Sequence, residues 1–361
     1  ASFIFLARRM PLSLCRRNQP GSGCRASWQI LLYTVLTNLI LFQRVFPDEI
    51  TQMVVVGDSY SDGGGDTGYV GLYANSTNVV PSIPTNQYSQ NRFSNGKTYV
   101  QIAADTLGLM MNNQAVGYAQ VLHNPLQMDA NTCRSVRIPD MMQQFWNWRN
   151  SSDLDLATVN SSLVVVAIGG NDLAELAQSY SYGAIGLVKF MVRCFEIVKE
   201  MVKKVGEMVT EGGLPKAHVV LVTFPAAWLL PYFRELGKFD DGALESFMKY
   251  LIRYQMKAFQ EGGYNFWNLA DEMEEVWLEG STNGIISNWP CFSFSEDSPL
   301  MADCPNYSGD ELYRLFGQNC TADTVDDFMF FDTIHPTAAT HKELGTSFAQ
   351  YLVGHNITSG G

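Results

Sequence analysis

Two kinds of apolar pattern alternate along residues 51–361. The first kind is a short uninterrupted apolar run that ends at a glycine or a polar turn, which predicts a buried strand of a parallel sheet. We expect such strands at residues 52–57, 110–116, 163–168, 218–224 and 264–269. The second kind repeats apolar residues every three or four positions and predicts amphipathic helices. We expect these helices at residues 95–107, 136–148, 186–211, 241–261 and 336–353.

Strands that alternate with helices are typical of an α/β fold, in which a parallel sheet carries helices on both faces. We therefore predict one α/β domain over residues 51–361, without a repeat or a low-complexity linker. Residues 62–95 and 279–328 are rich in glycine or proline, and we expect them to form long loops. In the helix predicted at 186–211, we expect the apolar residues that repeat every three or four positions to face the core, namely Val188, Met191, Phe195, Val198, Val202, Val205 and Val209.

A serine follows the first apolar run, in the sequence Gly57-Asp58-Ser59-Tyr60. A glycine permits a sharp turn, so Ser59 lies just past the carboxyl end of the predicted strand, where open α/β sheets bind ligands. A serine in this place could also be a simple helix cap. The choice between nucleophile and cap therefore depends on finding its chemical partners.

The partners are found near the other end of the chain, in Asp332-Thr333-Ile334-His335-Pro336. A carboxylate three residues before a histidine can hold the imidazole in one tautomer, while the second ring nitrogen takes a proton from a serine. Such an arrangement activates an oxygen nucleophile. We predict that Ser59, His335 and Asp332 form one catalytic site.

Four segments together resemble the GDSL, or SGNH, hydrolase family. They follow the order of the family's blocks and are residues 57–60, 112–119, 168–172 and 332–335. The resemblance implies a three-layer, flavodoxin-like α/β/α sandwich with a five-stranded parallel sheet, and ester hydrolysis through an acyl-enzyme without a cofactor or a metal. It implies that Ser59 is the nucleophile, His335 the general base and then acid, and Asp332 the orienting carboxylate. The implied oxyanion donors are the backbone N–H groups of Ser59 and Gly117 and the side chain of Asn171.

Two positions depart from the family pattern. Tyr118 stands where relatives often carry a second glycine, and Phe331 stands where a tryptophan often precedes the aspartate. Both could reshape the pocket for the acyl group or the alcohol. The large loops and acidic body resemble secreted fungal-type acetylesterases, which implies short acyl groups, acetyl above all, on carbohydrates or similar alcohols. The alternative is a lipid or phospholipid acylhydrolase.

Two other classes of function remain open from the sequence. Asp58, Asp62 and Asp66 could serve a metal-dependent phosphoesterase. A catalytically silent binding protein could also keep the fold, although the four residues Ser59, Asn171, Asp332 and His335 are all present.

Charge is distributed unevenly along the chain. The whole sequence carries −12, and residues 1–50 contain six arginines and two acids, so the remainder carries −16. An acidic body argues against nucleic acids and anionic lipid surfaces as the main partners. We expect a monomer that acts on a small-molecule or carbohydrate ester.

The N-terminal residues 1–50 have the pattern of a targeting segment. Basic residues precede the uncharged run 28–42, as in a signal peptide or a signal anchor. An overextended gene model or a buried helix is the alternative. We expect a secreted protein or one tethered to a membrane through residues 28–42.

Glycosylation sequons and cysteines also favour export. Six Asn-x-Ser/Thr sequons are present, a number that favours a secretory glycoprotein. Their asparagines are Asn75, Asn150, Asn160, Asn306, Asn319 and Asn356. Three of the seven cysteines fall in residues 291–320, where we expect a disulfide, with Cys304–Cys320 or Cys291–Cys304 as candidates. The cysteines lack the C-x-x-C spacing of zinc sites, so no metal site is predicted from them.

Overall fold

The computed structural model describes residues 49–78, 88–128, 134–151, 154–236, 241–293, 317–318, 320–321 and 323–358. The chain divides into two compact units, residues 1–49 and residues 50–361, and this description concerns the second. The predicted targeting run 28–42 lies outside the described residues, as do Asn306, Asn319 and Cys304. No helix in the described ranges is both long and apolar enough to cross a membrane.

A five-stranded parallel sheet forms the centre of the domain, as predicted. Its strand order is β2-β1-β5-β6-β7. The strands are β1 (Gln52–Gly57), β2 (Met110–Asn113), β5 (Ser162–Ala167), β6 (Val219–Val222) and β7 (Asn265–Trp267). Every residue of β1 and of β5 is buried, because the central strands are covered on both faces. Gly57 pairs with Ala167 in the register of these two strands, so their carboxyl ends lie side by side.

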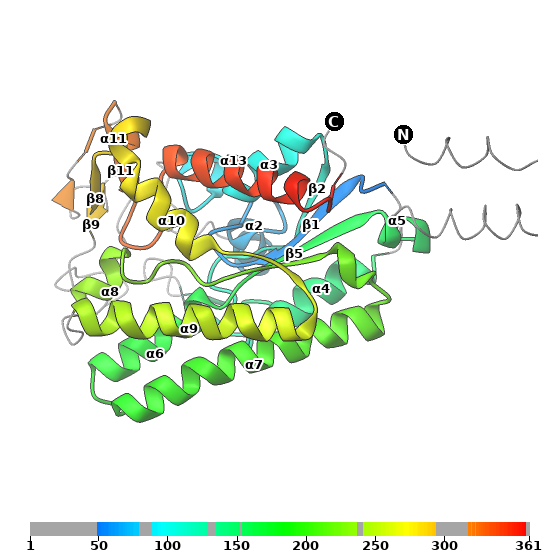
Figure 1. Ribbon diagram of the computed structural model, residues 1–361, viewed down its shortest axis with the longest axis horizontal. Helices are drawn as coiled ribbons and strands as arrows, with labels where there is room; N and C mark the ends of the chain where they lie inside the picture. The colour runs from blue at the N-terminus through cyan, green and yellow to red at the C-terminus, as the bar shows by residue number, and fades with distance from the viewer. Residues whose placement is uncertain are drawn as a thin grey trace, which may run out of the picture. The chain divides into compact units, whose positions relative to one another are not determined.

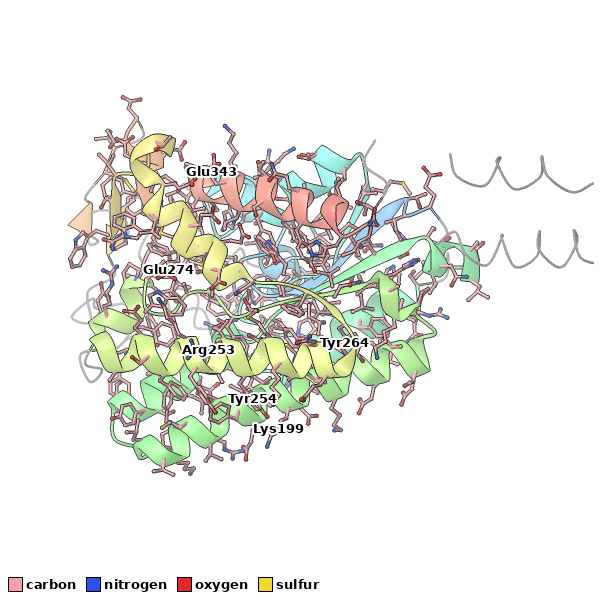
Figure 2. The ribbon with its side chains drawn as sticks, in the orientation of Figure 1. Lys199, Arg253, Tyr254, Tyr264, Glu274 and Glu343 are labelled. Atoms are coloured by element: carbon pink, nitrogen blue, oxygen red, sulfur yellow. A yellow bond between two sulfur atoms is a disulfide. The ribbon has the colours of Figure 1, made fainter. Side chains whose placement is uncertain are left out.

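Helices cover both faces of the sheet and complete the three layers (Figure 1). One layer contains α3 (Tyr99–Leu107) and α13 (Ala338–Gly354), with α10 (Leu269–Leu278) beside α13. The other layer contains α4 (Met141–Arg149), α6 (Gly170–Ser181), α7 (Leu187–Gly212) and α9 (Asp241–Gly262). Tyr254 of α9 points toward α7 in Figure 2, and its ring lies 4.9 Å from that of Phe195. The predicted α/β/α sandwich is therefore confirmed.

The prediction of a continuous loop over residues 62–95 is wrong in part. Helix α2 (Tyr69–Thr77) lies within it and buries Tyr69, Val70 and Tyr73. The rings of Tyr69 and Tyr73 lie 5.8 Å apart. Burial of this aromatic face gives the helix a stability that its glycine and asparagine content did not suggest.

The helix predicted at 136–148 begins later than expected. Its first residues belong instead to β4 (Ser135–Arg137), which pairs antiparallel with β3 (Leu126–Met128). Helix α4 starts after Asp140, whose side chain caps it by accepting the N–H of Gln143 at 2.8 Å. Pro139 explains the boundary, because the residue before a proline is disfavoured in a helical conformation.

The predicted core face of the long helix α7 is confirmed only in part, since Val198 and Val205 are buried but other predicted residues are not. Val188 was expected inside but is 76% exposed, and Met191 and Phe195 are only partly buried. The buried face consists of Phe190, Cys194, Ile197, Val198, Met201, Val205 and Met208. Apolar residues of α7 occupy most of the circumference of the helix. Their spacing in the sequence is therefore compatible with more than one buried face.

The region predicted as irregular, residues 279–328, contains short elements in its described parts. These are α11 (Gly280–Asn283), β8 (Ser287–Pro290), β9 (Phe292–Ser293), β10 (Gly317–Gln318) and η5 (Val325–Asp327). A disulfide lies in this region, as expected, but it joins Cys291 to Cys320, so both predicted pairings are wrong. Pairing of β9 with β10 brings the two cysteines together, a long-range effect that cysteine spacing does not encode.

Candidate active site

Ser59 lies on the turn that follows β1, where the backbone leaves the sheet. The N–H of Asp58 still donates to the carbonyl of Ala167 at 3.2 Å, and its own carbonyl accepts the N–H of Ser61 and of Asp62. A Cβ atom on Gly57 would lie 2.8 Å from the oxygen of Ala167, which explains the glycine at this position. The turn therefore presents Ser59 at the carboxyl edge of the sheet.

Gln144 of α4 holds the residue at which this turn begins. Its Oε1 accepts the N–H of Gly57 at 2.8 Å, and its Nε2 donates to the carbonyl of Gly57 at 2.9 Å. The side chain is fully buried. Sequence reasoning missed Gln144, although a polar residue on the apolar side of an amphipathic helix is the signal that could have pointed to it.

The structure brings together the three residues predicted as the catalytic set. Nε2 of His335 lies 2.8 Å from Oγ of Ser59, and Nδ1 of His335 lies 2.7 Å from Oδ2 of Asp332. The other carboxylate oxygen, Oδ1, accepts the backbone N–H of Ile334 and of His335, each at 2.8 Å. With its Nδ1 proton facing the carboxylate, the imidazole can accept the serine proton at Nε2.

The environment of Asp332 favours its charged form. Burial alone would raise the pKa of this carboxyl, but the His335 ring and the N–H groups of His335 and Ile334 outweigh burial and lower the pKa. The hydroxyl of Tyr88 also donates to Oδ2 at 2.8 Å. Tyr88 falls at the end of a predicted loop, and sequence reasoning did not single it out.

Tyr60 joins the nucleophile turn, defined here as residues 57–62 and named after the predicted nucleophile Ser59, to the segment that carries His335. Its hydroxyl donates to the carbonyl of Ile334 at 2.7 Å. This bond spans 274 positions of the chain and connects the residue after Ser59 with the residue before His335. It fixes the side chains of Ser59 and His335 relative to each other.

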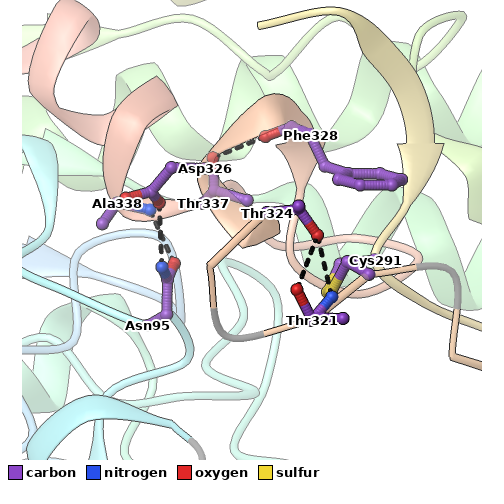
Figure 3. Close-up of a disulfide and its surroundings, with 9 residues drawn as sticks. Asn95, Cys291, Thr321, Thr324, Asp326, Phe328, Thr337 and Ala338 are labelled. Carbon is purple, nitrogen blue, oxygen red and sulfur yellow. Dashed lines mark hydrogen bonds between the residues drawn. A yellow bond between two sulfur atoms is a disulfide. The ribbon is translucent and has the colours of Figure 1, made fainter. Parts of the chain in front are cut away.

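The segment around His335 is anchored by further contacts from distant residues (Figure 3). Asn95 donates from Nδ2 to Asp326 at 2.9 Å and accepts the N–H of Ala338 at 2.7 Å. Thr337 donates to the carbonyl of Phe328 at 2.7 Å and so closes the loop between β11 (Phe328–Phe330) and α13. The whole acid–base loop, defined here as residues 328–337, is thus held at both ends.

Asn171 and Asp172 stand at the start of α6, beside the end of β1. Nδ2 of Asn171 donates to the carbonyl of Ala119 at 2.9 Å, and the amide has a second hydrogen to offer. The carboxylate of Asp172 accepts the N–H of Val121 at 2.8 Å and of Leu122 at 3.1 Å. The two side chains therefore fasten residues 119–122 to the site.

Gly117, a predicted oxyanion donor, is placed differently from Ser59 and Asn171. Its N–H donates to Oδ2 of Asp62 at 2.8 Å, and the residue does not line the pocket that contains the other two. The structure thus brings together two members of the predicted donor set, while the third N–H is occupied by a carboxylate. The catalytic role of all three stays a prediction.

Tyr118 adopts a left-handed backbone conformation, with φ of 67°. The position favours glycine, which adopts this conformation without steric cost. Its ring packs against Tyr69 at 5.0 Å and Phe93 at 5.6 Å between centroids. These contacts offset the local strain of a tyrosine in this conformation.

The aspartates considered for a metal-dependent reaction do not converge. Asp62 is buried and its oxygens accept the N–H groups of Gly64, Tyr69 and Gly117, whereas Asp66 is exposed. Across the described part of the chain, no group of three or more His, Cys, Asp or Glu side chains is arranged to hold a metal ion. Asp62 instead organises the backbone around the site.

A pocket opens beside Ser59. Asp58, Ser59 and Asn171 are among the polar residues that line it. Its wall is mainly apolar and comes from α6, from the segment that leads into α8 (Pro231–Glu235) and from α8 itself: Leu173, Ala174, Pro225, Ala227, Leu230 and Phe233. Burial raises the pKa of Asp58 to about 7, although the N–H groups of Tyr60 and Gly170 act in the opposite direction. The site therefore combines a hydrogen-bonded serine with a largely apolar cavity.

Comparisons with known proteins agree with this geometry. A family model described as GDSL-like lipase/acylhydrolase matches residues 53–348. The thermolabile hemolysin of Vibrio parahaemolyticus is 23% identical over 308 residues, which cover 82% of this chain and 62% of the hemolysin. The chain thus spans less than two thirds of the length of that curated relative.

Solved structures resemble the chain more weakly. A carbohydrate esterase family 2 enzyme with a carbohydrate binding domain, from Corynascus thermopiles (Myceliophthora fergusii), shows 17% identity and a TM-score of 0.41, with 86% of this chain and 68% of that chain covered. Phospholipase A1 from Streptomyces albidoflavus shows 15% identity and a TM-score of 0.38, with 85% and 99% covered. Similarity at this level gives no information about substrate. The family model spans most of the chain and contains every residue of the site described above, and the protein therefore belongs to the GDSL-like lipase/acylhydrolase family.

Proposed function

We propose that this protein hydrolyses carboxylic esters with Ser59 as the nucleophile. The observation that carries the proposal is the continuous hydrogen-bonded series from Ser59 Oγ through His335 to Asp332, with distances of 2.8 and 2.7 Å. The series ends at a pocket that Ser59 itself lines. Nucleophile, base and orienting group are therefore within reach of one another, as acyl transfer requires.

The reaction proceeds in two halves. Ser59 Oγ bonds to the carbonyl carbon while His335 Nε2 takes the serine proton, and His335 then gives that proton to the alcohol oxygen as the ester C–O bond breaks. In the second half, His335 takes a proton from water, whose oxygen attacks the acyl-enzyme. The bond to Ser59 breaks, the carboxylic acid leaves, and the proton returns to Ser59.

Negative charge develops on the carbonyl oxygen in both halves. The second amide hydrogen of Asn171 and the backbone N–H of Ser59 are the donors that we assign to it. Support comes from the bond between Asn171 and Ala119, which fixes the amide before substrate binds. Donors that need no reorganisation stabilise such a charge most effectively.

For the substrate, we propose a short acyl group, such as acetyl, on a carbohydrate or a similar alcohol. A lipid acyl ester is the second candidate, because Leu173, Leu230 and Phe233 give the pocket an apolar wall. A panel of p-nitrophenyl esters of increasing acyl length, together with acetylated sugars and a phospholipid, separates the two. Maximal kcat/KM on acetyl esters supports the first candidate, and a maximum at long acyl chains supports the second.

The nucleophile is tested by Ser59→Ala, measured with p-nitrophenyl acetate. We expect turnover to fall by at least about a thousandfold, while the thermal unfolding midpoint stays close to that of the wild type. Ser61→Ala is the matched control, since Ser61 lies on the same turn and contacts Tyr99 rather than His335. Unchanged turnover in Ser59→Ala would remove this residue from the mechanism.

We also propose that the protein is exported and acts as a monomer, either free or tethered through residues 28–42. Support comes from the disulfide between Cys291 and Cys320 and from the exposure of Asn75, Asn150 and Asn356, three of the sequon asparagines. Treatment with peptide-N-glycosidase should lower the apparent mass of protein made in a eukaryotic host. An unchanged mass would contradict the glycoprotein assignment.

A further inference from the structure

Asp332 has a second side-chain partner that the catalytic set does not include. The hydroxyl of Tyr88 donates to Oδ2 at 2.8 Å, and this is the same oxygen that faces Nδ1 of His335 at 2.7 Å. Asp332 is 2% exposed and Tyr88 is 7% exposed, so water does not compete freely at this oxygen. A buried bond to a charged acceptor is stronger than an exposed one.

A separate small core holds the ring of Tyr88 in place. This Tyr88 cluster consists of Tyr88, Cys291, Phe292, Cys320 and Phe331. The rings of Tyr88 and Phe331 lie 4.7 Å apart, and Phe331 directly precedes Asp332. The disulfide between Cys291 and Cys320 closes the cluster, and the N–H of Phe292 donates to the carbonyl of Phe331 at 3.0 Å.

We propose that Tyr88 is a positioning residue that acts through Asp332 on His335. By donating to Oδ2, the phenol withdraws part of the negative charge that otherwise stabilises the protonated imidazole. It also restricts rotation of the carboxylate, which keeps Oδ2 in line with Nδ1. The inference rests on the proposed function, because it concerns the base that activates Ser59.

Three other ionisable groups face His335, namely Tyr60, His341 and Asp58. Tyr60 is neutral, because burial raises its pKa well above 10.0. His341 of α13 is neutral as well, because burial lowers its pKa to about 3, and its Nδ1 accepts the N–H of Tyr99. Asp58, whose pKa burial raises to about 7, is the group that changes charge near neutral pH. Tyr88→Phe does not change Asp58. A difference between the pH profiles of the variant and the wild type therefore reports on Asp332 and His335.

The test is Tyr88→Phe, which removes the hydroxyl and keeps the ring in its cluster. We expect kcat to fall by about tenfold with KM little changed, as loss of a bond to a charged group predicts. We expect the acid limb of the kcat/KM profile to move to higher pH, because the protonated imidazole gains stability. Tyr73→Phe is the matched control, since that buried hydroxyl donates to the carbonyl of Arg134, away from the site.

Two further measurements keep the test independent of folding and of turnover. Site-specific incorporation of a fluorotyrosine at position 88 provides a stronger donor, so the acid limb should move in the opposite direction, to lower pH. The low-field proton resonance of His335 Nδ1–H should change in Tyr88→Phe even in the Ser59→Ala background, where nothing turns over. If Ser59→Ala retains activity, the proposed function fails whatever Tyr88 does.

A purely structural role for Tyr88 gives a different result. The acid limb and the Nδ1–H resonance would then stay at their wild-type positions in Tyr88→Phe, even if kcat fell. That outcome overturns the proposal, as does a fluorotyrosine protein whose profile moves in the same direction as that of Tyr88→Phe.

Discussion

The nucleophile turn, residues 57–62, and the acid–base loop both bury aspartates, yet the carboxyls of Asp58 and Asp332 behave oppositely. Burial raises the pKa of Asp58 to about 7, and bonds from backbone N–H groups only partly offset this. Burial acts on Asp332 too, but the His335 ring and two N–H groups outweigh it and lower the pKa. The His335 ring also acts on Asp58, but it hydrogen-bonds Asp332, so direct hydrogen bonds to the carboxylate, rather than depth in the protein, decide which carboxyl is charged.

The two regions also differ in the interactions that keep them in place. The turn is an extension of β1, and backbone groups of β5 and the amide of Gln144 fix it. The acid–base loop is held by side chains that come from distant segments, namely those of Tyr60, Tyr88 and Asn95. Substitutions in the loop should therefore change catalysis more than stability, and those beneath the turn should change both.

The largest effect is expected from Asp332→Asn. An amide cannot hold the Nδ1–H tautomer of His335, so we expect kcat to fall by about 10³–10⁴-fold. Activity on p-nitrophenyl acetate measures this. Asp326→Asn is the control, because Asp326 belongs to the same anchored segment but contacts Asn95. A rate near that of the wild type in Asp332→Asn would take this residue out of the mechanism.

Asn171→Ala should have the next largest effect. Loss of one oxyanion donor is expected to reduce kcat by about 10²–10³-fold and to leave KM nearly unchanged. Steady-state kinetics give both values, and thermal unfolding monitors the lost bond to Ala119. A change confined to KM would show that Asn171 binds substrate without stabilising the transition state.

A smaller and mixed effect is expected from Gln144→Leu, beneath the nucleophile turn. The buried N–H of Gly57 would lose its partner, which should lower the free energy of unfolding by about 1–3 kcal/mol. The displaced turn should also lower kcat by roughly tenfold, since small misplacements of reacting groups are costly. Gln143→Leu, on the exposed side of the same helix, is the control. Wild-type stability in Gln144→Leu would mean that the sheet alone holds the turn.

The smallest expected effect is on the dependence of stability on pH, which should distinguish Asp58 from Asp332. In the unfolded chain Asp58 loses its proton near pH 3.8, whereas in the folded protein it keeps the proton up to about pH 7. The folded state thus binds more protons in this window, and this residue makes stability fall as pH rises. Asp58→Asn should flatten that slope, and denaturant unfolding between pH 4 and 7 measures it. Asp66 is exposed, so Asp66→Asn is the control and should leave the slope unchanged. A slope in Asp58→Asn as steep as that of the wild type would contradict the raised pKa of Asp58.

Asp332 should change the dependence of stability on pH in the opposite direction. Its pKa is lowered in the folded protein, so its contribution to stability is present above about pH 4 and is lost as pH falls through the folded value. Asp332→Asn should therefore reduce the loss of stability in acid. The same unfolding series, extended below pH 4, measures this difference.

Local patterns predicted most of the sheet and the reacting groups. The strand ending at Gly57 and the spacing of Asp332 and His335 are signals within a few neighbouring residues, so they can be read without the fold. The predictions failed where packing between distant segments decides. Val188 lies outside because α9 and α6 select the buried face of α7, and Tyr69 lies in a helix because it packs against Tyr73, Phe93 and Tyr118.

By itself, the sequence determined the α/β order of the elements, because periodicity is a short-range property. Four short blocks in the order of the family also indicated the family by resemblance and predicted Ser59, Asp332 and His335 as the catalytic residues. Tertiary structure alone decided that Cys291 pairs with Cys320, that Asp62 takes the N–H of Gly117, and that Tyr88 and Gln144 support the site. The physical reason is the range of these interactions. A hydrogen bond or a disulfide between residues far apart in the chain depends on where folding places two backbones, and no local pattern records that distance.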